Sequence, residues 1–333
     1  MSTKMILLSV IIPFFNTFSR SEKVLKRVRD SLQQYSDVEF ILVDDGSKDD
    51  TLAQLRQYFQ IDKCSALLKI MTQENKGPGG ARNTGLNLAQ GKYIWFVDSD
   101  DDFYLDQIYP DLTLDNDFDF IDYNYTENGH VKNSMGLEAG VYYIDQVDLY
   151  KNLGRIWTKI FKRDFFVQNL LRYPEKCIYE DNYFVYTFPY FIKKFKKIEK
   201  IAYLYEVEVL SVTRETDISI RFYDRLLTSY NGLDFLNKNN AWFENKSAQQ
   251  RFKEIFLYNT AKKILLNMNL ERLKIIYYIF CTYNFLERKY IISNIKSSNQ
   301  KNRIVDFIRY FFPKKNYMPY FINLNKKVWH INE

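Results

Sequence analysis

The sequence predicts an α/β fold, in which a sheet is flanked by helices and followed by an α-helical C-terminal extension. Continuous apolar runs alternate with segments of helical periodicity through about the first hundred residues, as expected of strand-helix-strand units around a sheet. Polar clusters follow three of these runs, where ligands of open α/β sheets bind. Beyond residue 217, apolar residues recur at helical spacing in three segments, 217–237, 249–268 and 271–289.

The elements of the first hundred residues are predicted in the order β-α-β-α-β-α-β. The first run, 6–13, is apolar without alternation, as in a strand buried on both faces. Ser21 can cap the helix that follows, in which apolar residues recur at helical spacing. The remaining elements are a strand at 40–43, a helix at 51–59, a strand at 66–71, a helix at 81–89 and a strand at 93–97.

Composition narrows the classes of function. The 333 residues are 46% hydrophobic and 26% charged, enough for one large or two ordinary domains. No apolar run reaches the roughly 18 residues of a membrane span, and the N-terminal segment lacks a secretory cleavage site. We therefore expect a cytoplasmic protein, soluble or peripheral to the membrane. Three separated cysteines indicate reduced thiols, and two histidines leave any metal mainly to oxygen ligands.

Charge is divided unevenly along the chain. Residues 1–140 carry 14 Lys and Arg against 22 Asp and Glu, a net charge of −8, whereas residues 141–333 carry 33 against 19, a net charge of +14. A basic half suits phosphate, a membrane surface or nucleic acid. The 27 Tyr and 27 Phe could stack on bases. Most of them lie at strand or helix spacing, so we expect them in the core and expect no nucleic acid to bind.

The first polar cluster, residues 43–51, places Asp44 and Asp45 directly after a predicted strand. Asp-Gly-Ser is ordinary turn chemistry, and Asp50 or Thr51 can cap the next helix. The alternative interpretation is that a carboxylate at the strand end accepts hydrogen bonds from the base or ribose of a nucleotide.

The second cluster, residues 75–85, places four glycines and two cations, Lys76 and Arg82, between a strand and a helix. Its spacing is neither that of a phosphate-binding P-loop nor GxGxxG. We expect the glycines, Gly80 among them, to let the backbone approach a ligand closely. Arg82, at the helix start, offers planar donors to phosphate or to a carboxylate.

The third cluster contains four carboxylates in five residues, Asp98, Asp100, Asp101 and Asp102. Like charges this close raise one another's pKa unless a cation or solvent offsets them. Oxygen-only ligation selects hard cations, so we expect Mn²⁺ or Mg²⁺ here. The alternative is a solvated acidic loop that caps a helix beginning at Leu105.

Taken in order, these clusters resemble the motifs of the family 2 glycosyltransferases, inverting enzymes of the Rossmann-like GT-A fold that use nucleotide sugars. The matching segments are SVIIPFFN at 9–16, VDDGSKDDT at 43–51, NKGPGGARNTG at 75–85, VDSDD at 97–101, and 156–163 followed by 179–181. The resemblance covers roughly residues 6–215. It implies a GT-A catalytic domain, 1–215, built on a mixed sheet flanked by helices. This domain would have a nucleotide-sugar part at 1–115 and an acceptor part at 116–215, and a helical basic region would follow at 216–333.

The resemblance also assigns roles to residues. Asp45 would meet the base edge of a UDP-sugar, and Asp98 and Asp100 match the family's DxD motif, one touching the ribose and the other ligating the metal that bridges the diphosphate. The residues assigned to the nucleotide sugar are Pro13, Phe15, Asn16, Asp44, Asp45, Lys76, Gly80, Arg82, Asp98, Ser99 and Asp100.

Asp181 resembles the catalytic base of the family. Inverting transfer needs one carboxylate to take the proton of the acceptor hydroxyl, and a Lewis acid to stabilise the departing diphosphate. Trp157 and Lys159 are assigned to the acceptor side, although Trp157 is equally suited to the core. Glu180 either lies in the site or only begins the following helix. Arg214 either neutralises the diphosphate or lies in a surface loop.

Residues 286–333 carry ten Lys and Arg against three acidic residues, and apolar residues between 304 and 312 share one face of a helix that ends at Pro313. This pattern is typical of an interfacial helix, so we expect peripheral attachment to the inner face of the cell membrane. The alternative is packing on the catalytic domain or on a second subunit, which would give a homo-oligomer.

The sequence therefore predicts a metal-dependent inverting hexosyltransferase. The donor would be UDP-galactose, UDP-glucose or a UDP-N-acetylhexosamine, and the acceptor a saccharide or lipid-linked oligosaccharide in bacterial capsule or surface polysaccharide synthesis. Two alternatives are a catalytically inactive GT-A-fold partner subunit, which would be expected to lack Asp100 or Asp181, and a sugar nucleotidyltransferase, which would carry a glycine-rich signature near the first strand.

Overall fold

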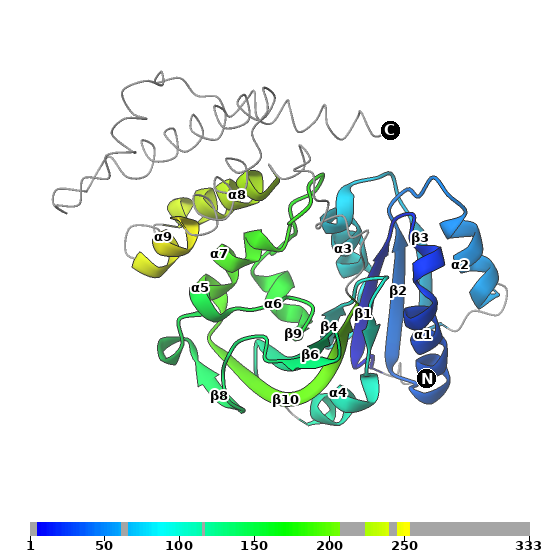
Figure 1. The fold of residues 1–333 in the computed structure, drawn as a ribbon, viewed down its shortest axis with the longest axis horizontal. Coiled ribbons are helices and arrows are strands. Elements are labelled where there is room, and N and C mark those ends of the chain that lie inside the picture. Colours follow the sequence, from blue (N-terminus) through cyan, green and yellow to red (C-terminus); the bar gives the residue numbers. More distant parts are fainter. Residues whose placement is uncertain (1–4, 61–65, 115–116, 207–223, 240–244, 254–333) are drawn as a thin grey trace, which may run out of the picture. The chain divides into compact units, whose positions relative to one another are not determined.

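A computed structural model of the chain describes residues 5–60, 66–114, 117–206, 224–239 and 245–253 (Figure 1). The chain divides into two compact units, residues 1–214 and 215–333. In the second unit the described elements are the helices α8 (Asp224–Lys238) and α9 (Lys246–Lys253), which overlap two of the predicted helical segments. The third segment and the basic helix near residue 304 lie outside the described residues.

The described part of the first unit is built on a ten-stranded mixed sheet, which confirms the predicted fold class. The strand order is β3-β2-β1-β4-β9-β6-β10-β5, with β7 paired to β6 and β8 paired to β10. The strands are β1 (Leu8–Phe14), β2 (Val38–Asp44), β3 (Leu68–Thr72), β4 (Tyr93–Phe96), β5 (Asp102–Phe103), β6 (Phe120–Glu127), β7 (His130–Lys132), β8 (Gly140–Tyr143), β9 (Lys159–Lys162) and β10 (Lys194–Tyr205). β1 to β4 are parallel, and β9 runs antiparallel between β4 and β6.

Helices cover both faces of this sheet. In chain order they are α1 (Glu22–Gln34), α2 (Thr51–Phe59), α3 (Gly77–Leu88), α4 (Leu105–Thr113), α5 (Leu149–Asn152), α6 (Arg163–Gln168) and α7 (Asn182–Phe191). The elements predicted for the first hundred residues occur in the predicted order. Ser21 precedes α1, but its Oγ donates to the carbonyl of Thr17 and makes no cap hydrogen bond to the helix.

The start of α3 corrects the interpretation of the glycine-rich cluster as a loop. α3 begins at Gly77, four residues before the predicted start, and Pro78 occupies its first turn. Proline is tolerated there because the first amides of a helix have no intrahelical acceptor. The glycines are therefore part of a helix. A Cβ on Gly80 would lie 2.3 Å from the Cβ of Lys76, so Gly80 is required by packing within the protein.

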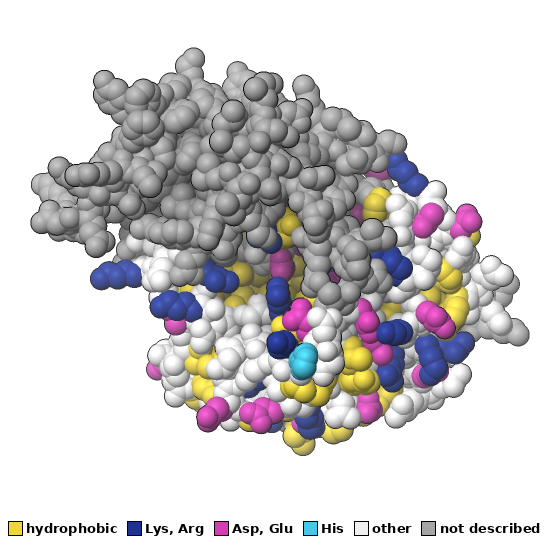
Figure 2. All heavy atoms as spheres, viewed as in Figure 1, with side chains coloured by type: hydrophobic (Ala, Val, Ile, Leu, Met, Phe, Trp, Pro, Cys, Tyr) yellow, Lys and Arg dark blue, Asp and Glu magenta, His cyan; other side chains and the backbone are white. Residues whose placement is uncertain are grey.

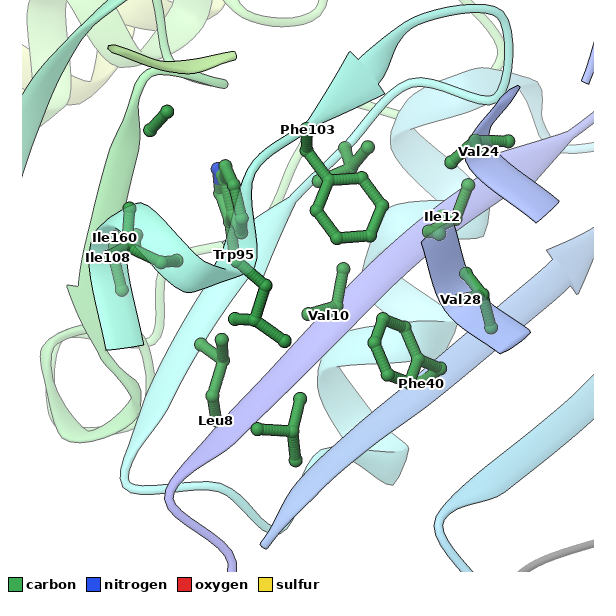
Figure 3. Packing of buried hydrophobic residues seen from close by; sticks show 14 of the residues in the cluster. Leu8, Val10, Ile12, Val24, Val28, Phe40, Trp95, Phe103, Ile108 and Ile160 are labelled. Carbon is green, nitrogen blue, oxygen red and sulfur yellow. The ribbon is translucent and has the colours of Figure 1, made fainter. Parts of the chain in front are cut away.

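The central strand β1 is buried on both faces, as its unbroken apolar run predicts. Val10 and Ile12 join a cluster with α1 and α4, in which Phe40, Trp95 and Phe103 also pack (Figure 3). Ile11 points to the opposite face, into a second cluster formed with α3, α6 and α7. Burial on both faces fixes the position of β1, whose carboxyl end belongs to the site described below.

A ladder of buried charges crosses β9, β6 and β10. Lys159, Asp122 and Lys197 occupy paired positions on the three strands. Lys159 Nζ donates to Asp122 Oδ1 at 2.8 Å and Lys197 Nζ donates to Asp122 Oδ2 at 2.9 Å, and all three side chains are fully buried. Burial lowers the pKa of Lys159, although Asp122 opposes that shift. The assignment of Lys159 to an acceptor is therefore wrong, because its ammonium is enclosed by the sheet.

Among the described residues, no helix combines the length and apolar character that crossing a bilayer requires. On the face shown in Figure 2, Lys and Arg side chains lie among Asp and Glu side chains over the described surface.

The ladder leads to a prediction about stability. Asp122→Asn removes the only charge that Lys159 and Lys197 share in the ladder, so it should lower the free energy of unfolding by about 3–5 kcal/mol. Urea unfolding followed by circular dichroism measures this. Asp117→Asn, at an exposed ion pair with Lys162, is the matched control and should leave the midpoint at its wild-type value. Equal midpoints for the two variants would contradict the stabilising role of the ladder.

Candidate active site

The site lies at the carboxyl edge of the parallel strands, where the chain order of the sheet reverses. β2 and β3 lie on one side of β1, and the chain then returns to place β4 on the other side. Ligands of open α/β sheets bind at such a switch point, outside the carboxyl ends of the strands. β2 ends at Asp44, β3 at Thr72 and β4 at Phe96, so each of the three polar clusters of the sequence follows a strand at this edge.

The turn after β1 and the loop after β2 are locked together through Asn16. Its backbone N–H donates to Ser47 Oγ at 2.9 Å, and its side-chain Oδ1 accepts from the N–H of Lys48 at 2.9 Å. Asn16 adopts a left-handed backbone, with φ of 51°, a conformation that asparagine tolerates better than most residues. The side-chain oxygen of Asn16 thus organises the two loops, while Phe15 beside it is exposed.

Asp44 and Asp45 are both buried, and they differ in their partners. Asp44 accepts hydrogen bonds from Thr72 Oγ1, at the end of β3, at 3.0 Å and from the N–H of Ser47, in the loop after β2, at 3.3 Å. Asp45 Oδ1 accepts from Gln73 Nε2 at 2.7 Å and from the N–H of Lys76 at 2.9 Å. Burial raises the pKa of Asp45 to about 6, because desolvation outweighs these hydrogen bonds.

The four carboxylates after β4 separate into two pairs. Asp101 accepts from Tyr203 Oη at 2.6 Å and from the N–H of Glu206, and Asp102 accepts from Arg27 Nε at 2.9 Å. Burial, together with the charges of Asp98 and Asp100, raises the pKa of Asp101 to about 9. Asp101 and Asp102 thus hold the loop in place. Asp98 and Asp100 are each partly exposed at the edge of the sheet.

The side chains assigned to a metal at this edge, Asp98 and Asp100, offer carboxylate oxygens. Within the described ranges no three His, Cys, Asp or Glu side chains gather closely enough to form a metal cluster. Asp98 and Asp100 fit a hard divalent ion that keeps several water or phosphate ligands, as Mg²⁺ commonly does. Ser99 lies between them and is hydrogen-bonded through its Oγ to Thr17 Oγ1 at 3.0 Å, which ties this loop to the turn after β1.

Arg82 joins the third cluster to a distant segment of the chain. Its Nη2 donates to Asp98 Oδ1 at 2.5 Å, and its Nη1 donates to Glu180 Oε1. Burial lowers the pKa of Arg82, but the charges of Asp98 and Glu180 raise it above its ordinary value. The guanidinium lies over the ring of Tyr173, 5.4 Å from the centroid. Arg82 therefore stays charged between two carboxylates.

Glu180 and Asp181 differ although they are adjacent. Glu180 is buried, and burial raises its pKa to about 7 while Arg82 opposes the shift. Asp181 is partly exposed and occupies the position before α7 without capping that helix through its side chain. The charges of Asp181 and Asp98 both act on Glu180 and on the Tyr173 hydroxyl, which places the two aspartates around one group of side chains.

The structure does not bring every assigned residue to this edge. Trp157 is half-buried and stacks on Tyr203 and Tyr205, with ring centroids 4.4 and 5.5 Å away, as the core alternative expects. Lys159 belongs to the buried ladder. Arg214 lies outside the described residues. Pro13, on β1, is partly buried next to the turn that Asn16 organises.

Three residues that position the site were missed from the sequence. Tyr203 lies within β10 and holds Asp101, and it also accepts a hydrogen bond from the N–H of Asp98 at 3.1 Å. Tyr173 supports Arg82, and Asn83 holds Tyr173. Asn83 was visible in the motif NKGPGGARNTG, whereas the two tyrosines carry no local signal that separates them from the other 25.

A mixed sheet with aspartates at the switch point and a Glu-Asp pair at the same edge defines a GT-A-type glycosyltransferase. The family described as "Glycosyl transferase family 2" matches residues 9–191, and the chain belongs to that family. This membership confirms the resemblance drawn from the motifs.

Similar proteins support the same assignment. The Bacillus subtilis protein EpsH is 26% identical over 261 residues, covering 74% of this chain and 72% of EpsH. A protein of Borreliella burgdorferi named cholesterol galactosyltransferase is 29% identical, over 75% of this chain and 72% of its own length. The fold is similar to that of residues 1–349 of S. aureus TarS, solved in complex with UDP-GlcNAc. The TM-score is 0.65 at 21% identity, and the match covers 84% of this chain and 81% of the solved TarS chain.

The raised pKa of Asp45 generates a prediction. The pKa of Asp45 in the folded protein, about 6, exceeds the ordinary value of 3.8. The folded protein therefore holds the Asp45 proton more tightly than the unfolded chain does. As the pH rises from about 4 to about 6, ionisation of Asp45 increasingly destabilises the folded protein. Asp45→Asn should therefore gain stability relative to wild type, by about 2 kcal/mol between pH 4.5 and pH 7.

Urea unfolding of both proteins at several pH values measures this difference, and the comparison cancels other groups that titrate. A difference that stays constant with pH, or that shrinks as the pH rises, would show that the Asp45 carboxyl is not perturbed by burial.

Proposed function

We propose that this glycosyltransferase transfers a hexose, with inversion, from a UDP-sugar to a saccharide acceptor. The observation that carries the proposal is the bridge made by Arg82, which joins Asp98 of the nucleotide-side cluster to Glu180, the neighbour of Asp181. A donor-binding carboxylate cluster and a candidate base thus belong to one connected site. The UDP-GlcNAc complex of TarS supports UDP as the nucleotide.

Asp45 is the group best suited to the base edge of the nucleotide. Asp45 is buried, so little water competes with a ligand for a hydrogen bond to its carboxylate. Its Oδ1 is already fixed by Gln73 and by the N–H of Lys76. An N–H of a pyrimidine base would offset part of the desolvation that raises the Asp45 pKa. Asp44, held by Thr72 and Ser47, then serves mainly to orient this loop.

Asp98 and Asp100 would hold Mn²⁺ or Mg²⁺ through their carboxylate oxygens. Such an ion, bound to the diphosphate, supplies charge neutralisation to the leaving group. Asp98 shares one oxygen with Arg82, which leaves its second oxygen for the ion. The loop that carries both residues is held by Asp101, Asp102 and Ser99, which limits the movement that metal binding would require.

Asp181 would act as the base. Its carboxylate would take the proton of the acceptor hydroxyl while that oxygen attacks the anomeric carbon, and UDP would leave from the opposite face, which inverts the configuration. Glu180 is a poorer candidate because it is buried and paired with Arg82. Partial exposure of Asp181 allows an acceptor to reach it.

The acceptor is proposed to be a saccharide or a lipid-linked oligosaccharide in the synthesis of bacterial capsule or another surface polysaccharide. This proposal rests on the basic C-terminal sequence and the expected attachment to the inner face of the membrane. The residues concerned lie outside the described part of the chain, as does the expected homo-oligomer contact through the C-terminal helices.

One experiment tests the donor class directly. The full-length protein, incubated with Mn²⁺ and a panel of UDP-sugars without acceptor, should release UDP slowly from one or two of them by hydrolysis. Release from GDP-sugars and not from any UDP-sugar would overturn the proposed nucleotide.

The role of Asp181 gives the sharpest prediction. Asp181→Asn should lower kcat by about 10²- to 10⁴-fold, because no carboxylate remains to take the proton. The Kd for the UDP-sugar should change by less than about fourfold, which corresponds to less than roughly 1 kcal/mol of binding free energy. UDP-release kinetics and calorimetric titration measure the two quantities. Asp164→Asn, at an exposed position in α6, is the matched control. Wild-type turnover by Asp181→Asn would rule out the base assignment.

The metal assignment is tested separately. Asp100→Ala should weaken UDP-sugar binding in Mn²⁺ by at least about tenfold, because a ligand to the ion is lost, and should leave the weak binding measured in EDTA unchanged. Asp106→Ala, an exposed aspartate in the first turn of α4, serves as the control. If binding by wild type is the same in Mn²⁺ and in EDTA, the proposed metal dependence is wrong.

A further inference from the structure

We propose that α3 is the positioning element of the active site: it fastens the segment 173–181, which carries the base, and through Arg82 it fixes that segment relative to Asp98. Gly79, Arg82, Asn83 and Glu180 then act as positioning residues that work through Asp181 and touch no reacting atom. The inference rests on the proposed function, since it explains how the base and the donor carboxylates keep their relative geometry.

The first fastening is made by Asn83. Its Oδ1 accepts from the N–H of Tyr173 at 2.9 Å, and its Nδ2 donates to the carbonyl of Tyr173 at 2.9 Å. One buried amide therefore satisfies both backbone groups of one residue, as a neighbouring strand would. Both backbone groups are buried, so breaking these hydrogen bonds would destabilise the folded protein. The start of the segment is therefore fixed at one position along the axis of α3.

The second contact is a close approach of the segment to α3, which the absence of a side chain at Gly79 allows. A Cβ there would lie 2.2 Å from the carbonyl oxygen of Pro174, 3.0 Å from the Cβ of Tyr173 and 3.3 Å from the Cβ of Glu180. Gly79 stands four residues before Asn83 and so shares its face of the helix. Residues near both ends of the segment 173–181 thus pack directly on the backbone of α3.

A third contact lies at the beginning of the helix. The N–H of Lys176 donates to the carbonyl of Lys76 at 2.5 Å, in the middle of the segment. Together with Asn83 and Gly79, this bond places three contacts within about two turns of α3. A segment held at three points cannot shift along the helix without breaking a buried hydrogen bond or meeting backbone atoms.

Arg82 converts this docking into a link with the nucleotide side. Both terminal nitrogens of its guanidinium are engaged, one with Asp98 and one with Glu180. The planar fork fixes the direction of both carboxylates. The sequence assigned Arg82 to the nucleotide sugar, and these contacts give it a different role, since its two arms reach carboxylates on either side of the site. Glu180 directly precedes Asp181, so the direction of the base follows from the bridge.

The consequence for catalysis concerns the rate of the chemical step. A base displaced by about 1 Å can cost on the order of 10²-fold in rate. Because Gly79 and Asn83 contact the segment that carries the base, disturbing the docking there should lower kcat and leave the KM for the UDP-sugar largely unchanged. A residue that merely stabilised the fold would leave kcat of the folded fraction unchanged.

Gly79→Ala tests the docking in the full-length protein. Its new methyl should push the segment from α3, lowering kcat for UDP release by about 10²-fold with a change in KM of less than about threefold. Gly140→Ala, on β8, is the matched control because the nearest atom to its Cβ would lie at 3.5 Å; its kcat should equal that of wild type. Wild-type kcat in folded Gly79→Ala, or a rise in KM that accounts for the loss, would overturn the inference.

Glu180→Gln provides a second variant if Gly79→Ala does not fold. It keeps the shape of the side chain and removes the charge paired with Arg82, so kcat should fall at least about tenfold at constant KM, as loss of a buried charge-assisted bond implies. Unchanged kcat in Glu180→Gln would also overturn the inference.

Hydrogen exchange measured by mass spectrometry separates this inference from the proposed function, because it needs no substrate. Peptides covering residues 175–183 should exchange at least about tenfold faster in Gly79→Ala than in wild type or Gly140→Ala, since their docking is weakened. Faster exchange in a protein that releases UDP from no sugar nucleotide would support the docking and contradict the proposed function. Unchanged exchange would overturn the docking whatever the activity.

Discussion

The organisation of the active-site edge depends on one interaction, the Arg82 guanidinium held between Asp98 and Glu180. Glu180 is buried and Asp98 is partly exposed, and without a cation between them the two carboxylates would repel each other. An arginine can remain charged there and can satisfy both at once because its donors form a planar fork. α3 carries this residue and packs on β1 so closely that a Cβ on Gly85 would lie 2.3 Å from the side chain of Ile11. The bridge is thereby anchored to the central strand.

Other buried charges of the first unit follow the same physical rule, that a buried charge must be paired and hydrogen-bonded. Asp122 is shared by two lysines within the sheet, and Glu39 accepts from Ser9 Oγ at 2.6 Å and from Lys69 Nζ at 2.7 Å. These networks join neighbouring strands and so specify their register. At the carboxyl edge, Asp101 and Asn16 do the equivalent work for loops. Loops held in this way suit the roles proposed for Asp98, Asp100 and Asp181, because electrostatic catalysis depends on charges that need no reorganisation during the reaction.

Much of the fold could be predicted from the sequence, because the relevant signals are local. An apolar run without alternation identified β1, and helical spacing identified α1 and α2. The start of α3 was missed because glycine and proline usually mark loops. Here Gly79 packs closely against residues 173–180 and Gly80 against Lys76, and the first helical turn accepts the proline. Lys159 was misassigned because a lysine in a strand is usually exposed. Only the pairing of β9 with β6 shows that Asp122 lies opposite it.

The sequence by itself determined the fold class, the order of the first elements and the family, because periodicity and an ordered set of short motifs depend on neighbouring residues alone. The tertiary structure decided how the carboxylates after β4 divide their roles, and which groups surround Asp181. Arg82 lies 16 residues from Asp98 and 98 from Glu180 along the chain. Contacts over such separations arise when strands pair and loops pack, and no local pattern specifies them. The sequence therefore supplies the types of residue at this edge, and the packing of α3 brings them together.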